Sequence, residues 1–148
     1  MTAWTKTRPQ ATGYYWLRRD PGRPRVVWVH ACPKQTVVII PGRTEALPLD
    51  SRTLSAARWS GPLRPPASWS TQRPRCKGFH WLRNDARGEP LVVEVRHEVL
   101  LDEYGVGVAP VVVGLGLHRI PLDDEEFDPC LWAGPLSAGA RHNNNATP

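Results

Sequence analysis

The chain contains an internal duplication, and this feature restricts its fold more than any other. Residues 13–18 (GYYWLR) return as residues 78–83 (GFHWLR), and residues 59–63 (WSGPL) return as residues 132–136 (WAGPL). Six of the seven Trp residues fall into three matched pairs that keep the same order. An ordered series of matches at a long period is the signature of a repeated structural unit. The sequence therefore predicts two tandem copies of one small domain.

The predicted organisation is a first repeat over residues 1–67, a second over residues 68–139 and a disordered polar tail over residues 140–148. A unit of this size buries only about 60% of the surface that its unfolded chain exposes, so it is marginally stable alone. We therefore expect the repeats to pack on each other about a pseudo-two-fold axis. Residues 1–67 expressed alone should be poorly folded.

The composition favours β structure, because 16 Pro and 12 Gly in 148 residues disfavour long helices. The predicted fold is mainly β, with two tandem β-meander or open-barrel units of SH3-like size. Residues 100–107 are expected to form a longer hairpin connection. Predicted strands cover residues 13–18, 26–30 and 37–40 in the first repeat, and residues 78–83, 91–97 and 108–117 in the second.

Each repeat should also contain one short helical turn. Asp50 is a candidate N-cap that would leave Leu54 facing inward. In the second copy Asp123 and Glu126 have the spacing of a capping box, and Phe127 takes the place of Leu54.

Alternation along residues 26–30 separates two faces of a strand. Val27 and Val29 should face the core, whereas Val26, Trp28 and His30 share the other face. Trp28 is matched by Glu94 in the second copy, which predicts an outer position for Trp28. An outward Trp there is either a binding feature or a contact between the repeats.

The aromatic strand of each copy gives a second set of candidates. Trp16 and its match Trp81 are expected to hold the two units together. Tyr15 is matched by His80, and this difference suggests a position near the surface. The matched Arg18 and Arg83 either pack along their stems and pair with an acid, or they line a symmetric anion site.

Charge is unevenly divided between the repeats. Residues 1–68 hold 11 Lys and Arg against 3 Asp and Glu, a net charge of +8, whereas residues 69–148 hold 8 against 11, a net charge of −3. A strongly basic unit attracts anionic partners. Opposite charge could equally help the two repeats to dock.

Signatures of catalysis and metal binding are absent from the sequence. No Gly-rich phosphate loop leads into a helix, and the five His residues show no HExxH spacing. The acidic run 123–126 lacks the ligand spacing of an EF-hand loop. Cys32, Cys76 and Cys130 form no CxxC pair, so they are expected to be reduced thiols. We therefore expect no enzyme activity, no cofactor and no metal.

The cellular setting is predicted from what the chain lacks. No apolar run approaches the roughly 20 residues that a membrane-spanning helix needs, and residues 1–7 have no apolar signal-peptide core. A soluble cytoplasmic protein that does not insert into membranes is the expectation.

The repeated motifs resemble those of a group of small bacteriophage and bacterial β-proteins that carry a single "PGWYW…WAGPI" unit. Here residues 13–16 with 59–63 match one unit, and residues 78–81 with 132–136 match a second. The resemblance implies a phage accessory protein that acts in the bacterial host cytoplasm, where such proteins often bind and disable a host factor.

Together these features predict a non-enzymatic, anti-defence binding protein that sequesters an anionic, nucleotide-like ligand. Aromatic side chains would stack on a base while Arg meets phosphate. An inhibitor that binds a host defence protein is the first alternative, and a single-stranded nucleic-acid-binding protein is the second. Self-association into a homo-oligomer stays open. The candidate ligand-binding residues are Trp28, Tyr15, Arg18, Arg25 and His30, with Arg83 as a symmetric partner.

Overall fold

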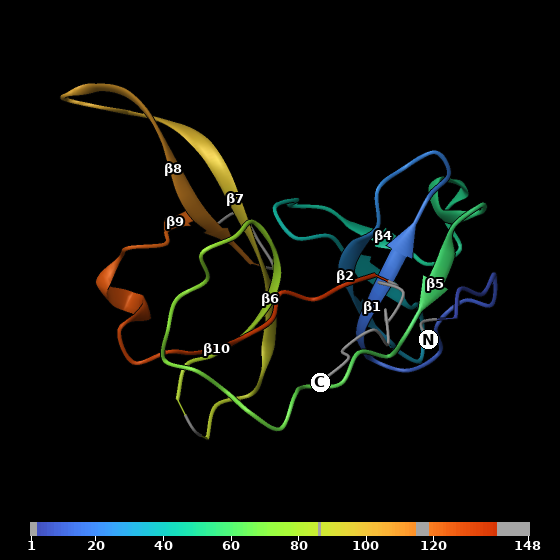
Figure 1. Ribbon diagram of the computed structural model, residues 1–148. Helices are drawn as coiled ribbons and strands as arrows, with labels where there is room; N and C mark the ends of the chain where they lie inside the picture. The colour runs from blue at the N-terminus through green and yellow to red at the C-terminus, as the bar shows by residue number, and fades with distance from the viewer. Residues whose placement is uncertain (1–2, 86, 115–118, 139–148) are drawn as a thin grey trace, which may run out of the picture.

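The computed structural model describes residues 3–85, 87–114 and 119–138. It contains two five-stranded antiparallel sheets, one in each repeat, which confirms the mainly β class (Figure 1). The first sheet consists of β1 (Gly13–Arg18), β2 (Arg25–His30), β3 (Val37–Ile39), β4 (Ala46–Pro48) and β5 (Arg58–Ser60). The second consists of β6 (Gly78–Arg83), β7 (Leu91–Asp102), β8 (Gly105–Val113), β9 (Arg119–Pro121) and β10 (Leu131–Ala133).

Both sheets have the same strand order. It is β4-β3-β2-β1-β5 in the first repeat and, in matching direction, β9-β8-β7-β6-β10 in the second. Four consecutive strands form a meander, and the fifth strand pairs with the other edge of the first. Trp16 lies opposite Ser60 in this last pairing, and Trp81 lies opposite Ala133. The duplication read from the sequence is therefore a duplication of topology and register.

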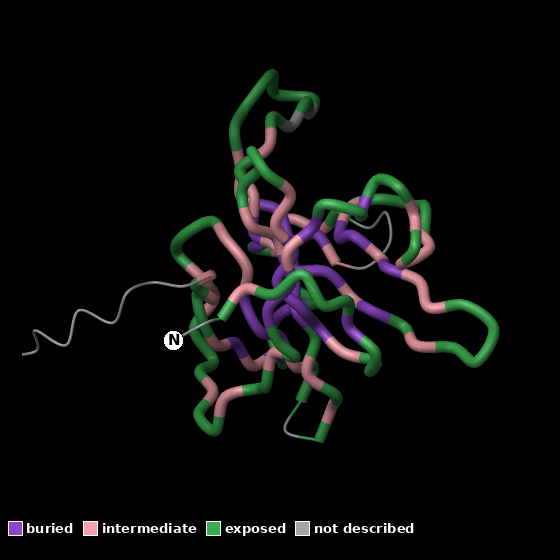
Figure 2. The backbone as a smooth tube through the Cα atoms, turned by 90° about the vertical axis from the view of Figure 1, so that its right-hand side faces the viewer, coloured by how far each residue is buried: buried purple, intermediate pink, exposed green. Residues whose placement is uncertain are grey.

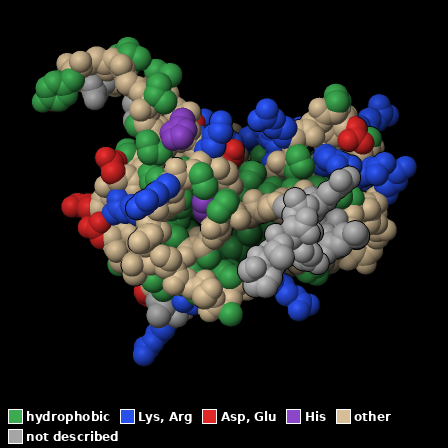
Figure 3. Space-filling view, viewed as in Figure 1, with side chains coloured by type: hydrophobic (Ala, Val, Ile, Leu, Met, Phe, Trp, Pro, Cys, Tyr) green, Lys and Arg blue, Asp and Glu red, His purple; other side chains and the backbone are tan. Residues whose placement is uncertain are grey.

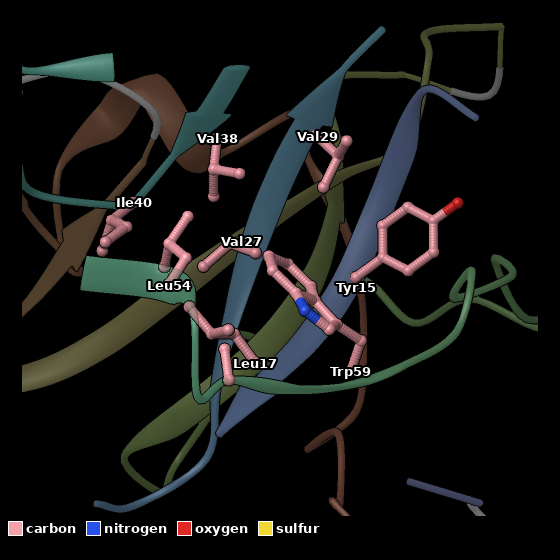
Figure 4. Close-up of a cluster of buried hydrophobic side chains, with 9 residues drawn as sticks. Tyr15, Leu17, Val27, Val29, Val38, Ile40, Leu54 and Trp59 are labelled. Carbon is pink, nitrogen blue, oxygen red and sulfur yellow. The ribbon is translucent and has the colours of Figure 1, made fainter. Parts of the chain in front are cut away.

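Each repeat has its own core on one face of its sheet. In the first repeat, alternate residues of β1 and β2 meet Leu54 and Trp59 (Figure 4). Their equivalents Phe127 and Trp132 occupy the second core. Val27 and Val29 are fully buried there, so the predicted core face of β2 is confirmed. Residues spaced by two share a face of a strand, and this is why the alternation identified the core.

The expected surface position of Tyr15 is wrong. Tyr15 is 5% exposed and its counterpart His80 is 3% exposed. The Tyr15 hydroxyl donates to the Ala11 carbonyl at 3.0 Å, and His80 Nε2 donates to the Cys76 carbonyl at 3.1 Å. Ala11 and Cys76 are themselves equivalent in the two copies. Each copy therefore uses a different side chain to donate to the equivalent backbone carbonyl. A buried hydroxyl or imidazole N–H needs such a hydrogen-bond partner.

The short helical turns are present, but their caps lie one residue later than expected. The 3-10 helices η1 (Arg52–Leu54) and η2 (Glu125–Phe127) are capped by Ser51 and Asp124 rather than by Asp50 and Asp123. The Asp124 carboxylate accepts from the Glu126 backbone N–H at 2.9 Å. A single 3-10 turn is shorter than the α-helical turn for which the capping-box spacing holds, so the cap shifts. In the part of the chain that the structure describes, no helix is long and apolar enough to cross a membrane.

The two repeats pack through the other faces of their sheets. Tyr14, Trp16 and Val26 from the first repeat form one buried cluster with Trp81 and Val92 from the second. Figure 2 shows this buried centre where the two units meet. Tyr14 lies 5.8 Å from Trp81, and Trp16 lies 5.5 Å from Phe79, both edge-to-face. Since Phe79 is the equivalent of Tyr14 and Trp81 that of Trp16, the two contacts are related by the expected pseudo-two-fold axis.

The insertion in the second repeat is an extension of two strands, which corrects the connection expected over residues 100–107. β7 continues to Asp102 and β8 begins at Gly105, so only Glu103 and Tyr104 form the turn. We call residues 97–110 the ribbon; it projects away from the body of the molecule in Figure 1. The strands were not predicted there, because the Gly and acidic residues in this stretch are typical of turns and mask the alternation of the apolar residues. The last three residues of the predicted strand 108–117 and the whole of the predicted tail 140–148 lie outside the described residues.

Candidate functional site

A groove of about 730 Å³ lies between the repeats. The first repeat contributes the start of β2 and the segment that follows β3. The second repeat contributes the start of β6, the middle of β7 and the segment that follows β10. The groove therefore exists only when the two repeats are packed together, and we take it as the candidate site.

Most of the charged residues that line the groove are cations. Its charged residues are Arg23 and Arg25 from the first repeat and Lys77, Glu94 and Arg96 from the second. Four cations against one carboxylate give a formal net charge of +3. Figure 3 shows Lys and Arg side chains gathered near the base of the ribbon and over the adjoining first repeat. A concave site lined by one sign of charge concentrates counter-ions, here anions.

Arg25 lies in a positively charged and partly buried environment. Burial lowers its pKa, and the positive charges of Arg43, Arg19 and Arg96 lower the pKa further, while Glu94 opposes them. Among the described residues, Arg25 forms no ion pair. A bound anion would supply the negative charge that this guanidinium lacks.

Glu94 is already engaged within the groove. Its Oε2 accepts a hydrogen bond from Arg96 Nη2 at 2.6 Å, and this bond raises the pKa of Arg96. The pair holds Arg96 on the groove wall, because charge-assisted hydrogen bonds fix the orientation of a guanidinium. Arg96 keeps further N–H donors for a ligand, since a guanidinium carries five.

Most of the remaining lining residues are apolar. They include the buried Trp16 and the half-buried Phe79, which meet edge-to-face, together with Leu136 and Ala138. Ligand sites commonly combine such an apolar lining with a few polar groups that fix orientation. Here the polar groups are cations, so the geometry suits a ligand with an apolar or aromatic part and more than one negative charge.

The duplication gives an internal comparison for this groove. The positions equivalent to Arg25, Lys77, Glu94 and Arg96 hold Leu91, Thr12, Trp28 and His30 in the other copy. All three of these cations are replaced by residues that carry no permanent charge. The positive charge is therefore a property of one of two related surfaces and does not follow from the fold.

Of the predicted site residues, only Arg25 lines the groove. Trp28 lies at the interface instead, half-buried against the cluster between the repeats and 4.6 Å from the Tyr14 ring. Tyr15 belongs to the core of the first repeat. His30 is exposed at the end of β2. Of these four residues, the sequence therefore identified one member of the site, and the structure places the other three in separate environments.

The matched arginines are equivalent in the structure as well. The Arg18 guanidinium stacks over Trp4 at 4.9 Å, and that of Arg83 stacks over Trp69 at 4.5 Å. Arg18 Nε also lies 3.6 Å from an Asp20 carboxylate oxygen. Each Arg therefore holds the Trp near the start of its own repeat through an interaction of a cation with an aromatic face. Neither side chain lines the groove.

The sequence analysis did not identify Lys77 and Arg96 as site residues. Both belong to the second repeat, whose net charge is negative, and the search for anion-binding residues had concentrated on the basic first repeat. The signal was present in the differences between the copies: Lys77 against Thr12 and Arg96 against His30. His97 also lines the groove, but among the described residues no group of three His, Cys, Asp or Glu side chains is placed to hold a metal ion.

Comparison with known proteins finds no match for this chain among protein-family models, curated proteins or solved structures.

Proposed function

We propose that the protein binds a small anionic ligand of the nucleotide class in the groove between its repeats and sequesters it. The observation that carries the proposal is the convergence of Arg25, Lys77 and Arg96 from both repeats on one groove with a net charge of +3. The related surface of the other copy holds Leu91, Thr12 and His30 instead.

Size and chemistry support a nucleotide. A volume of about 730 Å³ falls within the range of small-molecule sites, roughly 300–1,000 Å³. Arginines meet phosphate oxygens in a bidentate manner, while Phe79 and Leu136 offer an apolar wall for a sugar or base. A ligand in this groove would contact both repeats, so it would also stabilise their packing.

The proposed role is to hold the ligand without converting it. In the setting that the motif resemblance implies, a phage accessory protein would remove a nucleotide signal from the host's defence by binding it. Sequestration needs a high affinity and at least one protein molecule for each ligand molecule. Neither condition requires a catalytic group.

Calorimetry with the purified chain tests this proposal. The probes are cyclic mononucleotides, cyclic dinucleotides and, as a sugar-free anion, pyrophosphate. We expect at least one nucleotide to bind, and Arg25→Ala to weaken it by roughly 10- to 100-fold, since a charged hydrogen-bond partner is lost. Arg52→Ala removes the same charge from an exposed position on η1 and serves as the control.

Absence of heat with every probe, or equal binding by the Arg25→Ala variant, contradicts the proposal. A single-stranded oligonucleotide that binds more tightly than any small probe, with an affinity that falls steeply with salt, would instead favour nucleic-acid binding.

A further inference from the structure

A second, smaller hollow opens beside the groove, at the turn between β1 and β2. Its volume is about 60 Å³, and we call it the arginine hollow because Arg19, Arg23 and Arg25 line it together with Leu17 and Gly22. Arg23 and Arg25 also line the groove. The two spaces are therefore adjacent and share two guanidinium groups, so a single ligand can occupy both.

The turn brings these arginines together on a backbone with little freedom. The Gly22 N–H donates to the Arg19 carbonyl, and a Cβ at Gly22 would lie 2.5 Å from that carbonyl oxygen. Only glycine therefore fits this turn without a shift of the backbone. Pro24 separates Arg23 from Arg25, and its ring fixes the backbone dihedral φ between them. A site whose backbone is fixed before binding loses less entropy when a ligand arrives.

The positive charge of the arginine hollow has no ion-pair partner in the part of the chain that the structure describes. None of its three arginines forms a salt bridge there. The carboxylate of Asp20, which belongs to the same turn, lies 3.6 Å from Arg18 Nε and 3.9 Å from Arg58 Nε instead. The Glu94 carboxylate is engaged by Arg96 at 2.6 Å. This unbalanced positive charge favours binding of an anion.

The second repeat builds the equivalent turn without these cations. The positions equivalent to Arg19, Arg23 and Arg25 hold Asn84, Glu89 and Leu91. In that turn Asp85 Oδ1 accepts from the backbone N–H groups of Arg87 and Gly88, each at 2.7 Å. The three arginines are therefore not needed to form the turn, and their presence in one copy alone points to a role in binding.

The size and chemistry of the arginine hollow suit a phosphate group. Its volume is about 60 Å³ against about 730 Å³ for the groove, so it suits a compact group rather than a base or a sugar. Guanidinium groups present paired N–H donors that match phosphate oxygens. The groove supplies the apolar wall for the rest of the ligand and has its own cations in Lys77 and Arg96. The two spaces together suit a ligand with one phosphate in each.

We propose that the arginine hollow is a second phosphate subsite, so that the ligand carries at least two phosphate groups, one in the groove and one in the hollow. This inference rests on the proposed function, and it narrows the ligand from nucleotides in general to those with two or more phosphates. Arg25 lines both spaces and serves both phosphates. Nucleoside diphosphates and cyclic dinucleotides both meet the requirement, and the experiment below distinguishes them.

Calorimetry with the full chain compares ligands of the same base that carry one or two phosphates. The probes are AMP, ADP and cyclic di-AMP, together with their guanine counterparts. We expect at least one two-phosphate ligand to bind roughly tenfold more tightly than its mononucleotide, because the second phosphate adds charged hydrogen bonds. Preference for the diphosphate indicates adjacent phosphates, and preference for the cyclic dinucleotide indicates separated ones.

Arg19→Ala is the decisive variant, since Arg19 lines the hollow and not the groove. It should weaken the two-phosphate ligand by roughly tenfold and the mononucleotide by less than about twofold, because only the second phosphate loses a charged donor. Arg43→Ala is the matched control: Arg43 is exposed and its charge acts on Arg25, but it lines neither space. Its smaller effect should disappear as salt increases. Arg23→Ala is the second variant should Arg19→Ala fail to fold.

The outcomes separate this inference from the proposed function. A mononucleotide that binds as tightly as both two-phosphate ligands overturns the subsite and leaves nucleotide binding in place. So does an Arg19→Ala variant that weakens every ligand equally, or none. Pyrophosphate gives the opposite case: if it binds and Arg19→Ala weakens it while no nucleotide binds, the subsite is supported and the proposed function is wrong. Absence of binding by pyrophosphate and every nucleotide overturns both.

Discussion

Trp16 of the first repeat meets Phe79 of the second edge-to-face, with ring centroids 5.5 Å apart and an interplanar angle of 86°. The pseudosymmetric contact joins Tyr14 and Trp81 at 5.8 Å and 84°. Edge-to-face pairs of this kind add about 0.5–1.5 kcal/mol each beyond the area that they bury. Two related pairs at one interface fix the relative orientation of the repeats, and this orientation creates the groove.

The packing of the repeats predicts that neither is stable alone. In a fragment of residues 1–67, Tyr14, Trp16 and Val26 would lose their cover, although they are 4%, 4% and 0% exposed in the intact chain. We expect the fragment to melt without cooperativity, because the exposed apolar area opposes folding of so small a unit. Thermal unfolding followed by circular dichroism checks this. A sharp transition near the melting temperature of the full chain would show that the interface is dispensable.

We expect removal of the Glu94 carboxylate from the groove to strengthen anion binding. Glu94→Gln raises the formal charge of the groove and releases Arg96 from its ion pair. We expect affinity for an anionic probe to increase severalfold at low salt, and the gain to shrink as salt screens the charge. Glu89→Gln removes an exposed carboxylate outside the groove and should have a smaller effect. Weaker binding by Glu94→Gln would contradict this prediction, and would mean that the role of Glu94 in holding Arg96 outweighs the effect of its charge.

Because His80 is buried, we expect the protein to lose stability in mild acid. Burial lowers the pKa of His80 below the ordinary value of 6.5, although the hydrogen bond to the Cys76 carbonyl acts in the opposite direction. Below pH 6.5 the unfolded chain therefore takes up a proton before the folded chain does, and the free energy of unfolding falls as pH falls. Denaturant unfolding at several pH values measures this effect.

His80→Tyr is the informative variant for that experiment. It installs the donor that Tyr15 provides at the equivalent position, where the hydroxyl bonds the Ala11 carbonyl. The part of the acid sensitivity that is due to His80 should disappear. An unchanged pH dependence would assign the effect to other groups.

Gly134 is predicted to be intolerant of a side chain. Its φ is +133°, and a Cβ there would lie 3.0 Å from His80 Nδ1. Gly134→Ala should destabilise the fold by about 1–3 kcal/mol, since a residue other than glycine is strained in this region. Gly107→Ala is the control, because nothing lies within 4 Å of its Cβ. Equal stability of the two variants in denaturant would contradict this prediction.

The sequence by itself determined the duplication, the β class and most of each core. Matched motifs and alternation along the chain are local patterns, so Val27 and Val29 could be assigned to a core and Trp16 and Trp81 to the contact between repeats. The burial of Tyr15 was misjudged, because a difference between the copies does not reveal that Tyr15 and His80 are both buried and donate to equivalent backbone carbonyls.

Only the tertiary structure decided where the groove lies. Alternation along β2 shows which residues share a face, but it does not show what covers that face. Once the sheets pack, Trp28 is partly covered at the interface, while Arg25 meets Lys77 and Arg96 from the other repeat. These residues are distant in sequence and belong to units of opposite net charge. Their convergence depends on how the two sheets are placed, which no local pattern encodes.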